Sequence, residues 1–206
     1  WKTAEATTKK KEFTTNGHKI ANINAVKLTG LTPDTTYEYQ VGSEGAYSDV
    51  AEFTTDKAGR KNSRFFLIGD IQDPNKKNLE SIVNILNKDK YNFGVQIGDA
   101  IDNAADLGDW KEVGDLLGAK GVGSVDMINV MGNHEYYGDA NADIAAAMYN
   151  NPKTREGGYY SIRYGNIYIA TINFATTKGQ IREAADWLVK DAVKSNATWK
   201  ILCTHQ

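Results

Sequence analysis

The chain has 206 residues, with 24 Lys and Arg against 26 Asp and Glu and a formal net charge of -2. Hydrophobic residues make up 41% of it and charged residues 24%, which is typical of a globular protein of one or two domains. No stretch approaches the roughly 20 consecutive apolar residues of a membrane-spanning helix, and the charge balance provides no basic surface for a nucleic acid. We therefore predict neither a membrane span nor a nucleic-acid partner.

Residues 1–58 show the two-residue period of β-strands. Over 37–41, aromatic and apolar side chains alternate with polar ones, which is typical of a strand with one buried face. A second alternation over 50–54 follows a glycine-containing hairpin at 42–45. No helical period is visible in this part of the sequence. We therefore predict an all-β domain for residues 1–58.

A short motif in this part indicates a particular kind of β-sandwich. The run Leu-Thr-Pro-Asp-Thr-Thr-Tyr at 31–37 resembles the fibronectin type III pattern, in which leucine, proline and tyrosine lock a corner between strands. The resemblance implies a fibronectin type III-like sandwich for residues 1–58. Such a sandwich needs about 100 residues, so we expect its first strands to be missing from this sequence. Residues 55–63 are predicted to form the linker to a second domain.

From residue 64 to residue 206 the pattern changes to alternating strands and helices. Short apolar runs indicate buried strands, and apolar stripes at i, i+3 and i+4 over 79–86 and 181–192 indicate amphipathic helices. This alternation predicts an α/β domain built in layers. The predicted strands are 65–68, 93–97, 127–131, 167–170 and 199–202.

Polar clusters follow four of these strands. They are Gly-Asp-Ile-Gln at 69–72, Gly-Asp-Ala-Ile-Asp at 98–102, Gly-Asn-His-Glu at 132–135 and Thr-His at 204–205. The aspartates of the first two clusters are 29 positions apart, which is close to the ~30 residues of one βαβ unit. Open α/β sheets place their sites at the carboxyl ends of the strands. We therefore expect the four clusters to converge.

The clusters contain four acids, Asp70, Asp99, Asp102 and Glu135. If the clusters converge, the negative charges of these acids need nearby positive charge. Like charges about 4 Å apart repel one another by kilocalories in a protein. The clusters also offer an amide and imidazoles, and this set of donors suits ions such as Mn, Fe or Zn. We predict a centre that holds two divalent or trivalent metal ions.

Each cluster taken singly also has a purely structural interpretation. An aspartate after a strand often caps the next helix, as Asp70 or Asp99 would. The run at 132–135 could be a polar turn, and His205 could be a histidine packed in the core. The combination of the four clusters, in this order and at these spacings, favours a functional centre.

The ordered clusters resemble the motifs of the calcineurin-like metallophosphoesterases over residues 64–206. The run Gly-Asn-His-Glu at 132–135 is the most specific of them, and 158–166 looks like the strand pair that this family places before its fourth motif. With a β-sandwich before the catalytic domain, the chain looks like the purple acid phosphatase branch or a bacterial relative. The resemblance implies a layered αββα fold and a metal-dependent hydrolase whose substrate is a phosphorylated small molecule or ester. It also implies a location outside the cell or in the cell envelope.

The family pattern implies how five side chains would hold the metals. Asp70 would bind the first metal, and Asp99 would bridge both metals. Asn133 and His205 would bind the second metal. Gln72 stands where many members have a histidine, and its amide oxygen would either coordinate the first metal or hold a water.

The family pattern also implies two residues that act on the substrate. A hydroxide shared by the metals would attack phosphorus while His134 assists the leaving group. Asp102 would orient His134, as in the protein phosphatase members. Because Asp102 occupies the position of the tyrosine of purple acid phosphatases, the colour of an iron–tyrosinate bond is not expected. The Gly-His-x-His motif that completes both metal sites in the family does not occur before the last residue, Gln206.

Two other functions remain open at this point. The chain could belong to a surface or adhesion protein whose phosphoesterase domain has degenerated, with Gln72 as the first sign of decay. A nucleotide-binding doubly wound domain is a third interpretation, but no Gly-x-Gly-x-x-Gly and no phosphate-binding P-loop follows any predicted strand. Metal analysis and an aryl phosphate assay would distinguish the hydrolase from the degenerate surface or adhesion protein.

Overall fold

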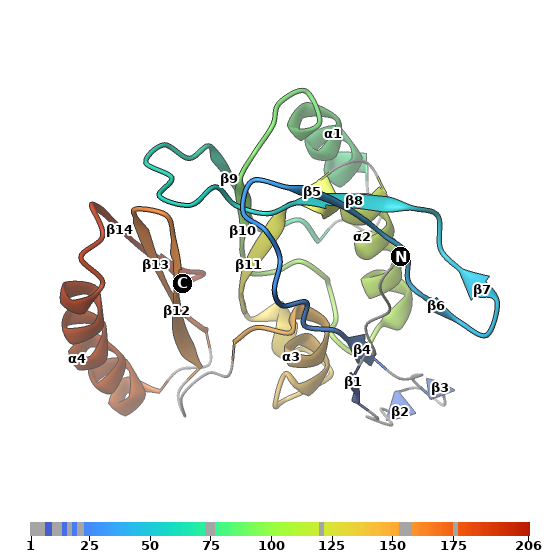
Figure 1. Cartoon of the computed structure of the whole chain (residues 1–206). Coiled ribbons are helices and arrows are strands. Elements are labelled where there is room, and N and C mark those ends of the chain that lie inside the picture. The colour runs from blue at the N-terminus through green and yellow to red at the C-terminus, as the bar shows by residue number, and fades with distance from the viewer. Residues whose placement is uncertain are drawn as a thin grey trace.

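The computed structural model describes residues 7–9, 14, 15, 18, 19, 23–72, 77–119, 122–152, 158–174 and 177–206, the short strands before residue 23 by their backbone alone. Within these ranges, strands alone occur up to Thr54, and strands and helices alternate from Phe65 onward (Figure 1). This order confirms the predicted fold class, a layered α/β structure preceded by an all-β part.

In the β part, the strands predicted over 37–41 and 50–54 pair with each other. Tyr37 and Phe53 stack across this pair, with ring centroids 5.6 Å apart. The hydroxyl of Tyr37 accepts a hydrogen bond of 2.9 Å from the backbone N–H of Thr32, which ties the preceding turn to the strand. The antiparallel pairs are β1 (Thr7–Lys9) with β4 (Ile23–Ala25), β2 (Thr14–Thr15) with β3 (His18–Lys19), β5 (Thr36–Tyr39) with β8 (Ala51–Thr54), and β6 (Gly42–Ser43) with β7 (Ala46–Tyr47).

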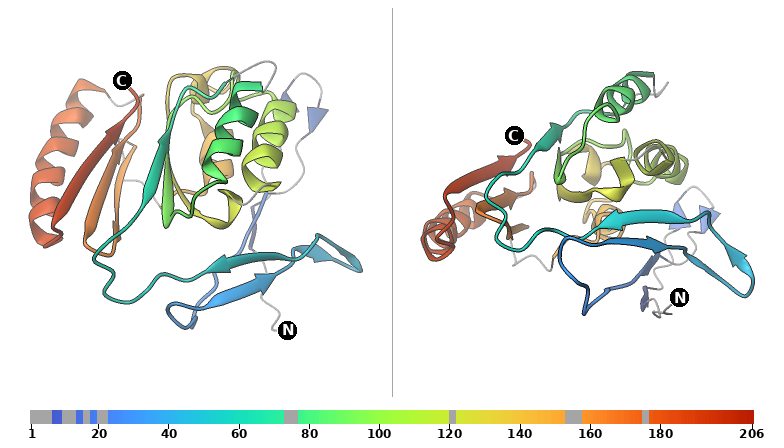
Figure 2. Two further views of the ribbon diagram at one scale, coloured as in Figure 1. Left: turned by 90° about the horizontal axis from the view of Figure 1, so that it is seen from above. Right: turned by 45° about the horizontal axis from the view of Figure 1, so that its top comes forward.

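Two three-stranded sheets face each other in the α/β part (Figures 1 and 2). Their strands are β9 (Phe65–Ile68), β10 (Phe93–Ile97), β11 (Asp126–Val130), β12 (Tyr159–Tyr164), β13 (Ile167–Ile172) and β14 (Trp199–Thr204). In the first sheet the order is β11-β10-β9, and all its strands are parallel. In the second sheet the order is β12-β13-β14, where β13 is antiparallel to β12 and parallel to β14.

All five predicted strands of the α/β part are present, but the stretch 158–166 differs from expectation. It holds one strand, β12, and the turn that joins this strand to β13, rather than a complete strand pair. The turn needs Gly165, whose φ of 56° lies in the left-handed region that favours glycine.

In the described residues, four α-helices cover the outer faces of the two sheets. They are α1 (Lys77–Leu86), α2 (Leu107–Ala119), α3 (Asp143–Tyr149) and α4 (Lys178–Lys194), with the 3-10 turns η1 (Val122–Ser124) and η2 (His134–Tyr136). The apolar stripes predicted α1 and α4 but neither α2 nor α3. None of the helices in the described ranges has the length and hydrophobicity needed to cross a membrane.

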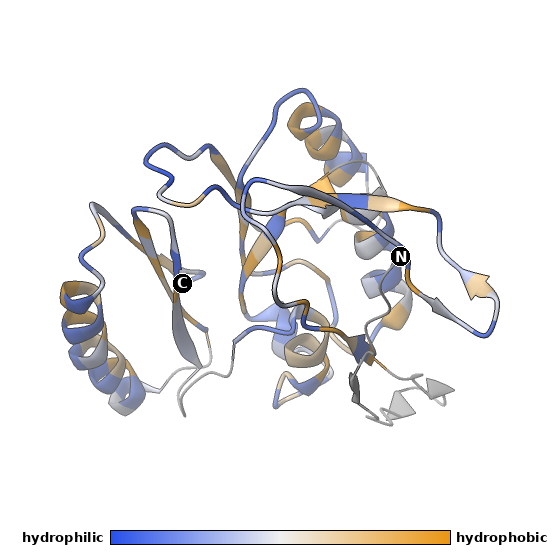
Figure 3. Cartoon of the chain, in the orientation of Figure 1, coloured by the Kyte–Doolittle hydropathy of each residue, from blue (hydrophilic) through white to orange (hydrophobic). Residues whose placement is uncertain are grey.

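Three groups of buried side chains separate four layers of secondary structure (Figure 2). Helices α1 to α3 pack on the first sheet through residues such as Leu79 and Ile144. The two sheets pack on each other through residues such as Val95 and Ile169, and α4 covers the far face of the second sheet, where Tyr168 is buried. Hydrophobic and hydrophilic residues accordingly alternate around α1 and α4 (Figure 3). The central strands β10 and β13 are covered on both faces, and their sequences are nearly continuous apolar runs.

Candidate metal centre

Four strand ends meet at one edge of the two sheets. Strands β9, β10 and β11 run parallel, so their carboxyl ends lie side by side, and β14 of the second sheet leads into His205. One carboxylate oxygen of Asp70, one of Asp99 and one ring nitrogen of His205 all lie within 4.8 Å of one another. This spacing suits ligands of one ion or of two ions about 3.5–4 Å apart.

Both aspartates of this group have an unusual backbone conformation. The φ angle is 51° at Asp70 and 56° at Asp99, in the left-handed region that few residues other than glycine adopt. Hydrogen bonds join the two turns, because the Asp70 N–H donates to the Gly98 carbonyl at 3.1 Å and the Ile71 N–H donates to the Asp99 carbonyl at 3.0 Å. Such conformations cost on the order of 1–3 kcal/mol each and cluster at functional sites.

The carboxylate of Asp99 is contacted by both His134 and His205. Its Oδ1 accepts a hydrogen bond of 3.0 Å from the backbone N–H of His134. Its Oδ2 lies 3.2 Å from Nε2 of His205 and 3.7 Å from Nε2 of His134. Only 4% of the Asp99 side chain is exposed, so its charge requires a cation or strong donors nearby.

The ring of His205 is oriented by the chain itself. Its Nδ1–H donates a hydrogen bond of 2.9 Å to the carbonyl of Ile97, the last residue of β10. Metal-binding histidines use their second nitrogen in this way, which leaves Nε2 free to act as a ligand. In that tautomer Nε2 and the Asp99 oxygen present lone pairs to each other at 3.2 Å. A metal cation bound by both atoms would offset this repulsion.

Gly98 leaves the room that this imidazole needs. A Cβ at Gly98 would lie 2.5 Å from Nδ1 and 2.6 Å from Cγ of His205, and the φ of 99° already favours glycine. We expect Gly98→Ala to displace the ring, to lower the metal content and to reduce the free energy of unfolding by about 1 kcal/mol or more. Thermal unfolding and metal analysis check this expectation.

The control for that substitution is Gly114→Ala in the exposed part of α2. Nothing lies within 4 Å of a methyl group added there, and alanine has the higher helix propensity. This variant should have unchanged or slightly higher stability and an unchanged metal content. Equal metal contents in the two variants would contradict the role given to Gly98.

His134 is held by the backbone of Asp102 more directly than by its carboxylate. The Nδ1–H of His134 donates to the Asp102 carbonyl oxygen at 2.7 Å, whereas the carboxylate oxygen lies 3.5 Å away. The Asp102 side chain is 71% exposed, so water screens its charge. The orienting contact expected of Asp102 is thus made chiefly by its main chain.

The amide of Asn133 has a partner at each end. Its Nδ2–H donates to the hydroxyl of Tyr137 at 2.9 Å, and its Oδ1 accepts from Nε2 of Gln206 at 3.2 Å. Tyr137 also contacts His134, with ring centroids 4.5 Å apart. Tyr137 is not among the site residues predicted from the sequence, although its place four residues after Asn133, across a single helical turn, was a usable signal.

Glu135 is compensated by the protein and needs no cation. It is fully buried, and its carboxylate accepts hydrogen bonds from three backbone N–H groups, those of Asp99 (2.9 Å), Ala100 (2.8 Å) and Gly132 (2.6 Å). The hydroxyl of Tyr149 donates a fourth, at 2.7 Å. Burial, and then the charge of Glu135, raise the pKa of the Tyr149 phenol well above its ordinary value, so this donor stays protonated. Glu135 therefore joins the loops after β10 and β11.

Gln72 has a buried oxygen atom that lacks a partner. Its Nε2 lies 3.5 Å from Oδ2 of Asp99, at the outer limit of a hydrogen bond. Its Oε1 is buried, and no donor among the described residues reaches it. A buried acceptor without a donor is costly, and a bound cation or water would satisfy it. The donors at this edge thus fit a metal centre.

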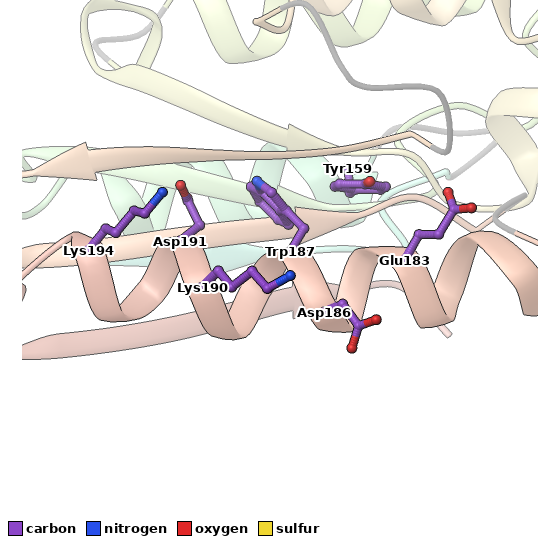
Figure 4. Close-up of a pocket in the computed structure, with 7 residues that line it drawn as sticks. All are labelled: Tyr159, Glu183, Asp186, Trp187, Lys190, Asp191 and Lys194. Carbon is purple, nitrogen blue, oxygen red and sulfur yellow. The ribbon is translucent and has the colours of Figure 1, made fainter.

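Two cavities in the described part of the chain lie outside the centre itself. A groove of about 430 Å³ lies between α4 and β12, where the Tyr159 and Trp187 rings are surrounded by acids and lysines of α4 (Figure 4). A smaller pocket of about 220 Å³ is lined by Ile172, Phe174 and Gln206, among others. The smaller pocket borders the centre, because Gln206 contacts Asn133. Cavity size therefore does not locate the site, and the donor chemistry does.

Comparisons with known proteins show the family of the chain. The family model "Purple acid Phosphatase, N-terminal domain" matches residues 1–55, and the model "Calcineurin-like phosphoesterase" matches residues 63–206. No curated protein matches the chain. Among solved structures, a purple acid phosphatase isolated from yellow lupin (Lupinus luteus) seeds is 18% identical with a TM-score of 0.75. A dimetal phosphatase from Danio rerio is 16% identical with a TM-score of 0.40, and the match covers 63% of this chain and 52% of that one.

The lupin match covers 97% of this chain but 43% of the lupin chain, so the chain spans less than half of that protein. At this level of identity the likeness shows a shared fold.

Proposed function

Because the chain belongs to the calcineurin-like phosphoesterase family, whose model matches residues 63–206, we propose that it is part of a metal-dependent phosphoester hydrolase. The observation that carries this proposal is the group formed by Asp70, Asp99 and His205, whose ligand atoms lie within 4.8 Å of one another. The substrate class is a phosphorylated small molecule or another phosphoester.

The proposal divides the chain into two domains. Residues 1–58 form part of a fibronectin type III-like β-sandwich, supported by the hydrogen bond between Tyr37 and Thr32 at the turn before β5. Residues 64–206 carry the catalytic centre. A place outside the cell or in the cell envelope is part of the same proposal, and it rests on the sandwich domain.

The metal ligands are proposed from the family resemblance, and their donor chemistry supports them. Asp70 and Gln72 would hold the first ion, Asp99 would contribute to both sites, and Asn133 and His205 would hold the second ion. When bound, two such cations lower the pKa of a shared water towards neutrality and balance the charge of the phosphate. The buried and unpaired Oε1 of Gln72 supports its place in this set.

His134 is proposed to assist the leaving group. Its Nδ1–H is engaged by the Asp102 carbonyl, so Nε2 is the atom that would carry the second proton of the imidazolium form and give it to the leaving oxygen, which leaves the ring neutral. Asp102 acts through His134, by fixing the direction of the ring. Nε2 lies 3.7 Å from Oδ2 of Asp99, which brings this proton next to the bridging ligand.

Metal analysis of the full-length protein, combined with hydrolysis of an aryl phosphate, tests the proposed function. We expect two metal ions per chain and hydrolysis that a chelator abolishes and added metal restores. A folded protein without bound metal and without hydrolysis would favour the alternative, a degenerate phosphoesterase-fold surface or adhesion protein.

The choice of metal gives a further prediction. An amide oxygen is a hard donor and an imidazole nitrogen a borderline one, so Gln72→His should raise the affinity for Zn²⁺ relative to Mn²⁺. We expect a change on the order of 10-fold, as for other changes around metal ligands. Titrations of the metal-free protein with each ion measure it. The control is Gln40→His in the β part, and equal Zn²⁺ to Mn²⁺ preferences in both variants would remove Gln72 from the ligand set.

A further inference from the structure

We propose that Tyr137 is a positioning residue that orients both the Asn133 amide and the His134 ring. This inference rests on the metal centre of the proposed function. Tyr137 lies outside the sequence motifs from which the centre was predicted.

The turn η2 places Tyr137 over both residues. The backbone N–H of Tyr137 donates to the carbonyl of His134 at 3.0 Å, and the N–H of Tyr136 donates to the carbonyl of Asn133 at 3.1 Å. This tight turn brings the side chain of Tyr137 back over the start of the run. Its hydroxyl then reaches the Asn133 amide nitrogen at 2.9 Å, and its ring contacts the imidazole of His134.

The hydroxyl contact decides which end of the amide faces the centre. A side-chain amide has a donor end and an acceptor end, and only the oxygen can bind a cation. The Tyr137 hydroxyl accepts from the nitrogen, so the oxygen points the other way. There it accepts from Nε2 of Gln206 at 3.2 Å, beside His205 in the chain. Without the hydroxyl, either end of the amide could face the second metal ion.

The ring contact restricts His134 in a separate way. The two rings are 4.5 Å apart and inclined by 44°, and the Asp102 carbonyl holds Nδ1 at 2.7 Å. The carbonyl fixes one atom of the imidazole, and the tyrosine ring limits rotation about that contact. A phenylalanine at position 137 would keep this packing and lose only the hydroxyl.

Two substitutions therefore separate the two contacts. We expect Tyr137→Phe to weaken the binding of the more loosely held Zn²⁺ ion by about 10-fold, as loss of a partner of a metal ligand does, and to lower turnover at saturating Zn²⁺ less than Tyr137→Ala does. Tyr137→Ala should weaken Zn²⁺ binding equally and, in addition, lower turnover at saturating Zn²⁺. Tyr137 is 47% exposed, so the protein should tolerate both changes.

The matched control is Tyr136→Phe, because the Tyr136 ring packs against Phe174 and the core instead. Zn²⁺ titrations of the full-length protein, with Asn133→Ala as a reference, give the readout. If Tyr137→Phe binds Zn²⁺ as Tyr136→Phe does while Asn133→Ala binds it weakly, the role of Tyr137 is overturned and the metal centre stands. If Asn133→Ala also binds Zn²⁺ normally, the proposed ligand set itself fails.

Discussion

Replacing His134 with glutamine is expected to leave the metal content unchanged and to lower turnover by about 10²–10⁴-fold, the range typical of removing a general acid. Glutamine keeps a polar side chain, and the hydrogen bond to Asp99 Oδ1 comes from the backbone of residue 134, so the carboxylate stays in place. Turnover of an aryl phosphate at saturating substrate, with metal analysis of the same sample, measures both effects.

The control for this prediction is Asp102→Asn. The carbonyl of Asp102 rather than its exposed carboxylate holds the imidazole, so this variant should lose much less activity than His134→Gln. An activity as low as that of His134→Gln would show that the carboxylate matters more than its distance indicates. Wild-type turnover in His134→Gln would exclude the histidine from the leaving-group step.

Glu135→Gln is expected to cost the most stability of any single change discussed for the centre. The added NH₂ group would face backbone N–H donors where the carboxylate now accepts four hydrogen bonds. Unsatisfied buried donors cost about 1–3 kcal/mol each, so we expect a loss of about 3 kcal/mol or more. In a protein of this size that lowers the melting temperature by roughly 6–12 °C. Differential scanning calorimetry measures the change.

Two further variants give reference values for this loss of stability. Tyr149→Phe removes one of the four donors and should cost about 1 kcal/mol. Glu112→Gln changes an exposed glutamate on α2 and should stay within about 0.5 kcal/mol of the original stability. A melting temperature of Glu135→Gln equal to that of Glu112→Gln would mean that Glu135 does not join the two loops.

The periodicity of the apolar residues was sufficient to predict strands of the α/β part and the strongly amphipathic helices. The five predicted strands and the helices α1 and α4 are where the apolar patterns predicted them. Helix α2 escaped prediction because it contains three glycines, Gly108, Gly114 and Gly118, each about 1 kcal/mol less favourable than alanine in a helix. Helix α3 has only seven residues, too few for its period to be recognised.

The spacing of the polar clusters predicted the edge at which they would meet, since parallel strands bring their carboxyl ends together. The contact between His205 and Asp99 joins two different sheets, however, and a local pattern holds no information on how sheets face each other. The same is true of Gly98, whose lack of a side chain matters only because a histidine 107 positions later packs against it.

The sequence by itself determined the change from an all-β part to an α/β part, the donor types available at the four strand ends and the family to which the chain belongs. Only the tertiary structure decided which acids need a cation. Glu135 is compensated by N–H groups and Asp102 by water, while Asp99 is buried against two imidazoles. The reason is physical: the charge of a carboxylate depends on what surrounds it, and its surroundings come from segments far apart in the chain.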